Sequence, residues 1–166
     1  MTLAEAAAQG EELAQSGSER ELADLRAKWA DDLEGAARGA DFRERAVAFR
    51  AIGQFRWRAK EELLRRGLDD ESPACRGSAL LSLELLSRDH PSTINGVRAL
   101  LHTLATADGN AAVRRLAILC LKNGSAERNT IVLLEGLAAD DEADAELRRA
   151  AGNVAQHLKK KQTKKS

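Results

Sequence analysis

The chain of 166 residues contains no tyrosine, only three phenylalanines and two tryptophans, and only two prolines. Aromatic side chains can therefore fill little of its interior, and a core must be built from Leu, Ala, Val and Ile. The sequence is rich in Ala, Leu, Arg, Glu and Lys instead, a composition typical of helical proteins. These features predict an all-α protein.

Cysteine pairs, signal sequences and long apolar runs are also lacking. Cys75 and Cys120 lie far apart and outside any C-x-x-C pair, so we expect buried free thiols rather than a disulfide or a metal site. The N-terminus (MTLAEAAAQGEEL) has neither the basic start nor the apolar run of a secretion signal. No stretch approaches 18 uninterrupted apolar residues, so no membrane span is predicted. We therefore expect a reduced, cytoplasmic protein.

Residue clusters that carry catalysis are not found in the sequence. His90, His102 and His157 are well separated, whereas metal sites need clustered ligands. The serines lie on predicted helix faces or caps, without the strand-turn-helix elbow of a nucleophilic serine. The glycines are scattered at predicted helix ends and form no phosphate-binding loop. We predict no enzyme activity, no metal and no cofactor.

Charge is balanced over the whole chain, with 26 Lys and Arg against 26 Asp and Glu, but it is unevenly distributed. Residues 1–40 hold 9 acidic and 4 basic residues (net −5), and residues 41–68 hold 8 basic and 4 acidic residues (net +4). Residues 69–158 are net −4, with 9 basic and 13 acidic residues, and the last eight residues are net +5. Salt screens exposed charges beyond roughly 8 to 10 Å, so electrostatic attraction would act locally.

A recurring motif organises the middle of the chain. It occurs at residues 70–83 (DESPACRGSALLSL) and 108–121 (DGNAAVRRLAILCL), and more weakly at 142–155 (EADAELRRAAGNVA). In each copy an acid precedes an arginine by six positions, and an alanine follows that arginine by three. Arg43 and Ala46 repeat the second half without the acid. The arginines recur every 33 to 38 residues, which is the spacing of helical repeats. The motif residues are Asp70, Arg76 and Ala79; Asp108, Arg114 and Ala117; Glu142, Arg148 and Ala151.

This motif resembles the HEAT repeat, in particular its short lyase-like variant, in which a helix A and an aspartate-bearing turn precede a helix B that begins apolar-Arg-x-x-Ala. The resemblance covers residues 56–158 well and 19–53 poorly. It implies a right-handed α-α superhelix of three to four helix pairs, in which the motif acids and arginines form a structural ladder of charge-assisted hydrogen bonds. The expected parts are a cap helix over 1–17, a repeat domain over 18–158 with pairs at about 19–53, 56–88, 91–122 and 126–158, and a disordered basic tail over 159–166.

Helix ends are predicted from capping signals. Ser18 and Glu21 match a capping box for a helix that starts near residue 19. Pro73 and Pro91 are each predicted to start a helix, and Asn110 is the predicted cap of the helix that follows. Ser125, and Asp140 or Asp141, are predicted caps for the last two helices. Gly53 is expected to break or bend the third helix.

A partner-binding ridge is predicted on the B helices, which line the concave side of HEAT-like solenoids. Positions one, five and eight after each motif arginine share one stripe of the helix, and this stripe changes from apolar to basic along the chain. An acidic amphipathic segment or a phosphorylated one would suit it. Alternatively, the helix at 110–121 is apolar only because neighbouring pairs cover it. The predicted ridge consists of Gly77, Leu81, Glu84, Arg115, Leu119, Lys122, Arg149, Asn153 and Gln156.

A second candidate surface lies at residues 49–60 (FRAIGQFRWRAK), where basic and aromatic residues alternate. Basic side chains could bind phosphates while nucleic-acid bases stack on the rings, and the lysine tail could assist. A structural alternative is that Phe49 and Trp57 anchor a junction between helix pairs, with the arginines in water. The basic residues of this cluster are Arg50, Arg56, Arg58 and Lys60.

The function that we predict is a non-catalytic protein-binding module, such as an adaptor, a scaffold or a regulatory subunit. Nucleic-acid binding is the alternative function. A third function, that of a lyase or lyase chaperone of the bilin-attachment type, is implied by the family resemblance alone.

Overall fold

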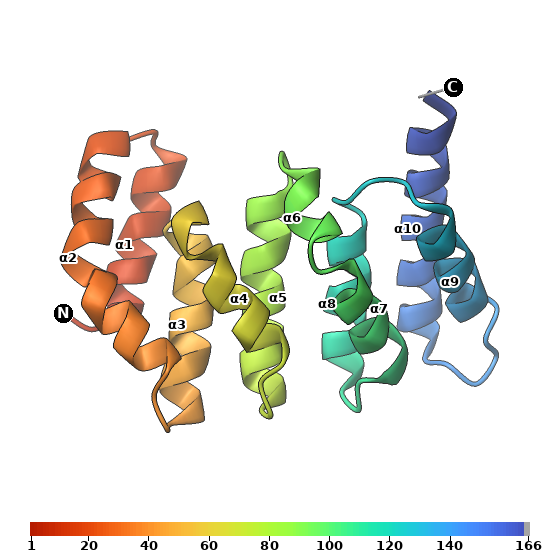
Figure 1. Ribbon diagram of the computed structural model, residues 1–166, viewed down its shortest axis with the longest axis horizontal. Coiled ribbons are helices and arrows are strands. Elements are labelled where there is room, and N and C mark those ends of the chain that lie inside the picture. The colour runs from red at the N-terminus through yellow and green to blue at the C-terminus, as the bar shows by residue number, and fades with distance from the viewer. Residues whose placement is uncertain (165–166) are drawn as a thin grey trace. The chain divides into compact units, whose positions relative to one another are not determined.

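The computed structural model describes residues 1–164, and every regular element within this range is helical (Figure 1). The all-α prediction is therefore confirmed. The chain divides into two compact units, an N-terminal unit (Met1–Leu86) and a C-terminal unit (Ser87–Ser166). The helices are α1 (Leu3–Gln15), α2 (Glu19–Ala37), α3 (Phe42–Gln54), the short 3₁₀ helix η1 (Arg58–Lys60), α4 (Glu61–Leu68), α5 (Pro73–Ser87), α6 (Pro91–Asn95), α7 (Arg98–Ala107), α8 (Ala111–Leu121), α9 (Arg128–Ala138) and α10 (Ala145–Lys164).

The N-terminal unit is built around α3, which packs against α1, α2 and α4. Phe49 and Phe55 are fully buried, and the rings of Phe55 and Trp57 meet edge to face with centroids 5.8 Å apart. Trp29 is also buried. Phe49 and Phe55 thus form part of the interior, whereas Trp57 is half-buried.

Close contact of α3 with α5 depends on Gly53. A Cβ at this position would lie 2.7 Å from Cα of Ser82, which leaves no room for a side chain. The Gly53 N–H donates to Ser82 Oγ (3.0 Å), and this hydroxyl donates in turn to the Phe49 carbonyl (2.5 Å). The sequence predicts that Gly53 breaks or bends the third helix; α3 ends one residue after it, at Gln54, and the absence of a side chain at Gly53 accommodates α5.

Arg45 links three segments of the N-terminal unit. Its guanidinium forms a bidentate pair with Asp70, through Nε (2.9 Å) and Nη2 (3.1 Å), and both side chains are largely buried. Its Nη1 donates to the carbonyls of Gly39 and Ala40. Asp70 therefore pairs with an arginine of α3 that lies two positions after the Arg43 of the sequence motif.

The motif arginines themselves donate mainly to backbone carbonyls. Arg76 donates to Asp70 O (2.9 Å) and Glu71 O (3.1 Å), and Arg114 donates to Ala105 O (2.9 Å). Arg148 approaches Asp141 to 3.9 Å. Arg76 thus binds the turn before α5 and Arg114 binds the last turn of α7, while the motif alanines are fully buried at Ala79, Ala117 and Ala151.

The C-terminal unit contains two packed pairs, α7 with α8 and α9 with α10, and α8 also packs against α10. The helix expected from Pro91 onward is interrupted at Gly96 and Val97, between α6 and α7. Side chains on either side of this break bind the segment before α9: Asn95 Nδ2 donates to Ser125 Oγ (2.8 Å), and Arg98 Nη2 donates to Ser125 O (3.2 Å). Ser125 is consequently part of this link and does not cap α9, whose N-cap is Glu127.

Helix α10 extends to Lys164, so residues 159–164 are helical where the sequence led us to expect a disordered tail. Lys161 Nζ donates to the carbonyls of Lys122 (2.7 Å) and Gly124 (3.2 Å), beyond the end of α8. Lys159 pairs with Glu135 of α9 (2.6 Å). Lysines near a helix C-terminus also interact favourably with the helix dipole. The remainder of the predicted tail, 165–166, lies outside the described residues.

Two further predicted helix caps, besides Ser125, differ in the structure. Ser18 Oγ contacts Ser16 Oγ (2.9 Å) and makes no capping bond to α2. Asp144, rather than Asp140 or Asp141, accepts a hydrogen bond from the Leu147 N–H in the first turn of α10 (3.3 Å). A capping box does occur at α1, where Thr2 and Glu5 each accept a hydrogen bond from the other's backbone N–H.

Substitution of Thr2 by alanine is expected to lower the free energy of unfolding of the N-terminal unit by about 1 kcal/mol, because it removes a capping hydrogen bond. Ser18→Ala serves as the matched control and should change that free energy by less than about half as much. Both tryptophans lie in the N-terminal unit, so urea denaturation followed by tryptophan fluorescence measures this unit selectively. Equal effects of the two substitutions would contradict the assignment of the cap to Thr2.

Candidate partner-binding surface

The residues predicted to form one ridge are divided between the two units. Gly77, Leu81 and Glu84 lie on α5 in the N-terminal unit, where Leu81 is 42% exposed and Glu84 is half-buried. The other residues of the prediction lie on α8 and α10 in the C-terminal unit. We refer to this second group as the α8–α10 surface: Arg115, Leu119, Lys122, Arg149, Asn153 and Gln156.

Helices α8 and α10 lie side by side and run in the same direction. Near the start of both helices, Arg115 forms an ion pair with Glu146. Near their ends, Lys161 Nζ donates to the carbonyl of Lys122. Residues at corresponding positions along the two helices can therefore contact the same ligand.

An apolar position lies at the centre of the α8–α10 surface. Leu119 is 38% exposed, although Ile118 and Cys120 on either side of it are fully buried. The alternative that α8 is apolar because other helices cover it explains the buried residues of α8, but within the C-terminal unit it does not explain Leu119. Leu119 is thus an exposed apolar side chain between two buried neighbours on α8.

Charged and polar side chains surround Leu119. Arg149, Asn153 and Gln156 are exposed on α10, and Lys122 is half-buried one turn after Leu119. Neither Lys122 nor Arg149 has an ion-pair partner among residues 1–164. Arg115, in contrast, is engaged with Glu146. Lys122 and Arg149 are therefore the basic groups most available to an acidic ligand.

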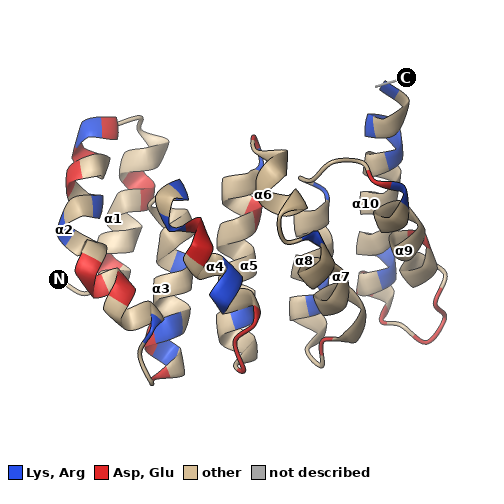
Figure 2. Cartoon of the chain, in the orientation of Figure 1, with Lys and Arg blue, Asp and Glu red and all other residues tan. Residues whose placement is uncertain are grey.

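Further basic residues from the end of α10 belong to the same region. Burial lowers the pKa of His157, and the positive charges of Lys161, Lys122, Lys160 and Lys164 lower it further. Figure 2 shows basic residues along α10. Lys160 and Lys164 were not predicted to belong to this surface, because they fall in the expected disordered tail. The apolar stripe of α10 could have indicated that the helix continues through these lysines. The stripe reaches Leu158, and Lys161 follows at the helical spacing of three.

The basic cluster at residues 50–60 is largely occupied by contacts within the N-terminal unit. Arg58 pairs with Glu61 (3.2 Å), and Lys60 pairs with Glu34 (2.8 Å) and lies over the Trp57 ring. Arg56 donates to the Gly53 carbonyl (2.8 Å), and Arg50 is half-buried. The structure therefore gives these four side chains local partners or partial burial, which reduces their availability to phosphate groups.

Arg56 occupies an unusual backbone position. Its φ angle of 53° lies in the left-handed region that normally favours glycine. Arg26 stabilises this turn by donating to the carbonyls of Phe55 (2.8 Å) and Arg56 (2.9 Å). The turn directs the chain from α3 into η1 and α4, so Arg26 and Arg56 have a structural role that the sequence did not indicate.

The described residues contain no cluster of His, Cys, Asp or Glu that could hold a metal ion. His102 lies 2.9 Å from the Thr130 hydroxyl, and burial lowers its pKa, with a further contribution from Arg98. Cys75 and Cys120 are free and fully buried, one in each unit. None of the helices within residues 1–164 combines the length and apolar character that a membrane span requires.

Comparison of the chain with protein-family models, with curated proteins and with solved structures found no match.

Proposed function

We propose that this chain is a non-catalytic protein-binding module of HEAT-like helix pairs, and that the α8–α10 surface binds an acidic amphipathic segment of a partner protein. The proposed pairs are α4 with α5, α6 and α7 with α8, and α9 with α10, arranged as a right-handed solenoid. Buried free thiols suit a reducing compartment such as the cytoplasm. The partially exposed Leu119, set between the basic residues Lys122 and Arg149, is the observation that supports the proposal most directly.

An acidic amphipathic segment fits this arrangement for two reasons. Its apolar side chains would cover Leu119 and remove that side chain from water, which is favourable by about 25 cal/mol per Å² of apolar area. Its carboxylates would approach Lys122 and Arg149, which lack ion-pair partners in the part of the chain that the structure describes. The exposed amides of Asn153 and Gln156 can hydrogen-bond the backbone or polar side chains of the segment.

Reversal of charge at Lys122 and Arg149 tests the proposal. A photo-crosslinking amino acid at position 119 is expected to capture a specific partner from native lysate, and Lys122→Glu combined with Arg149→Glu should reduce capture at least about tenfold. These two positions are preferable to Arg115, because reversal there would also break the ion pair with Glu146. Circular dichroism would verify that each variant is folded.

Two controls make this experiment selective. Arg65→Glu combined with Arg128→Glu changes the charge equally at exposed sites outside the surface and should leave capture unchanged. A crosslinker at Val132, which is exposed on α9, should not capture the same partner. Unchanged capture by the Lys122/Arg149 variant would refute the proposed site. Recovery of nucleic acid with a steep salt dependence would favour the alternative function instead.

A further inference from the structure

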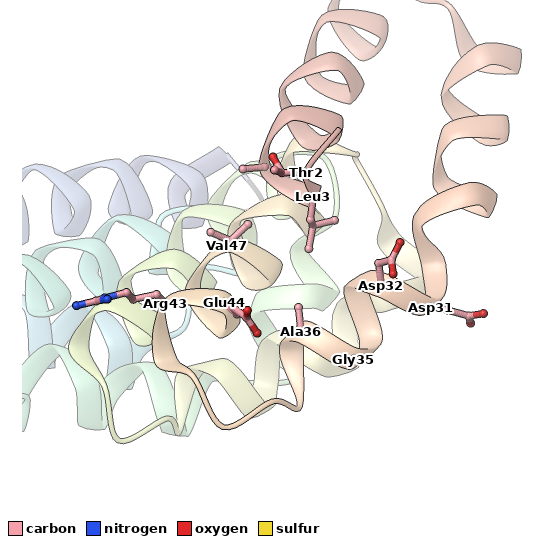
Figure 3. Close-up of a pocket in the computed structure, with 10 residues that line it drawn as sticks. Thr2, Leu3, Asp31, Asp32, Gly35, Ala36, Arg43, Glu44 and Val47 are labelled. Carbon is pink, nitrogen blue, oxygen red and sulfur yellow. The ribbon is translucent and has the colours of Figure 1, made fainter.

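A pocket of about 620 Å³ opens in the N-terminal unit, where the start of α1, the second half of α2 and the start of α3 meet (Figure 3). Ligand pockets in proteins range from roughly 300 to 1,000 Å³, so this space can hold more than an isolated ion. The pocket is separate from the α8–α10 surface, which belongs to the other unit. Its lining residues are Thr2, Leu3, Ala4, Asp31, Asp32, Gly35, Ala36, Arg43, Glu44 and Val47.

The base of the pocket is apolar. Leu3 from α1, Ala36 from α2 and Val47 from α3 point towards one another in Figure 3. Val47 remains 37% exposed, and Leu3 and Ala36 are half-buried. These side chains leave apolar surface uncovered, and an apolar group from another molecule could remove it from water.

The rim of the pocket is acidic. Asp31, Asp32 and Glu44 are all exposed, and none of them has an ion-pair or hydrogen-bond partner for its carboxylate among residues 1–164. Arg43 is the one basic residue of the lining, and its guanidinium lies over the Phe42 ring, 5.6 Å from the centroid. In Figure 3 Arg43 extends away from Leu3, Ala36 and Val47. Three carboxylates against one arginine leave the lining with a net charge of −2.

The N-termini of the helices near the pocket have the opposite electrostatic effect from the carboxylates, because a helix N-terminus favours anions. At α1 the Thr2 side chain accepts a hydrogen bond from a first-turn N–H, and at α3 the Asp41 side chain does the same. These bonds reduce the number of free donors, and Asp41 adds a further negative charge. The exposed carboxylates therefore dominate the charge that an approaching ligand encounters.

From this combination we infer that the pocket binds a basic segment of a partner protein, in which a large apolar side chain is flanked by lysine or arginine. The apolar side chain would cover Val47 and Leu3, and the flanking cations would pair with Asp31, Asp32 and Glu44. The basic end of α10 in a second copy of the chain is a poorer occupant, because residues 159–164 (KKKQTK) provide charge without a large apolar side chain.

Selection from a displayed library of short random peptides on the full chain tests this inference. Enriched peptides are expected to carry a large apolar residue flanked by lysine or arginine. For a synthesised enriched peptide, Asp31→Asn, Asp32→Asn and Glu44→Gln combined should weaken binding at least about tenfold, and added salt should weaken binding to the wild type. Val47→Ser, at an exposed position, should weaken binding independently of charge.

The matched control is Glu12→Gln, Glu62→Gln and Glu71→Gln combined, which removes the same charge from exposed sites of the same unit and should leave peptide binding unchanged. Enrichment of acidic or uncharged peptides, or equal binding by the pocket variant and the wild type, would overturn the inference. Analytical sedimentation then tests whether the chain self-associates. If the wild type self-associates and the pocket variant does not, a second copy of the chain, rather than a partner segment, occupies the pocket.

Discussion

Substitution of Gly53 by valine is expected to lower the free energy of unfolding of the N-terminal unit by about 3 kcal/mol, the upper part of the range for overpacked interiors. The added Cβ would lie 2.7 Å from Cα of Ser82, and backbone atoms cannot move aside as a flexible side chain can. Separation of α3 from α5 would also lengthen the hydrogen bonds that Ser82 Oγ makes with Gly53 and Phe49. Urea denaturation followed by tryptophan fluorescence measures the effect.

The control for this prediction is Gly35→Ala. Gly35 lies within α2, and nothing is within 4 Å of the position that its Cβ would occupy. Alanine is favoured over glycine inside helices, so this substitution should raise the free energy of unfolding by roughly 0.5 to 1 kcal/mol. The decisive result is a change of opposite sign in the free energy of unfolding for the two glycine substitutions. A destabilised Gly35→Ala variant would contradict the assignment of the Gly53→Val effect to the contact with Ser82.

Substitution of Asp70 by asparagine should lower the free energy of unfolding at neutral pH by about 2 kcal/mol, because the amide carries no charge and has only one oxygen to accept the two hydrogen bonds that Arg45 donates to the carboxylate. The stability of the wild type should also depend on this residue in acid. Burial acts to raise the pKa of Asp70, but hydrogen bonds from Arg45 and from the Ser72 backbone N–H hold that pKa below its ordinary value.

The direction of the pH effect follows from this lowered pKa. The contribution of Asp70 to stability is fully present above the pKa of the unfolded chain, about 3.9, and is lost as pH falls through the lower pKa of the folded state. Denaturation at several pH values below about 5 should therefore show a smaller loss of stability for Asp70→Asn than for the wild type. The neighbouring exposed residue provides a control, since Asp69→Asn removes the same charge and should preserve the wild-type pH dependence.

The sequence predicted helices best where apolar spacing and a local start signal agree. The helix that begins at Pro73 and the one capped by Asn110 both occur as expected. Predictions failed where a contact distant in sequence decides the outcome. Gly53 is needed for its close contact with Ser82 on another helix, and Ser125 binds Asn95 instead of capping α9. Such contacts leave no signature within a window of a few residues.

The candidate sites show the same distinction. Leu119, which the spacing from the motif arginines assigned to the predicted ridge, is partly exposed on α8; helical periodicity fixes which residues share a face. Partners of charged residues were not predictable in this way. The pairing of Arg115 with Glu146 and of Lys60 with Glu34 depends on which helices pack together. The pocket between α1, α2 and α3 was missed for the same reason, since its lining comes from three separate helices.

The burial of one cysteine in each unit has a practical consequence. An alkylating reagent in solution can reach Cys75 or Cys120 only when the surrounding helices separate, because both thiols are fully buried. Mass spectrometry distinguishes the two modified peptides after digestion. A single labelling time course on the unaltered chain would therefore yield separate opening rates for the two halves of the molecule and would show whether they open together or independently.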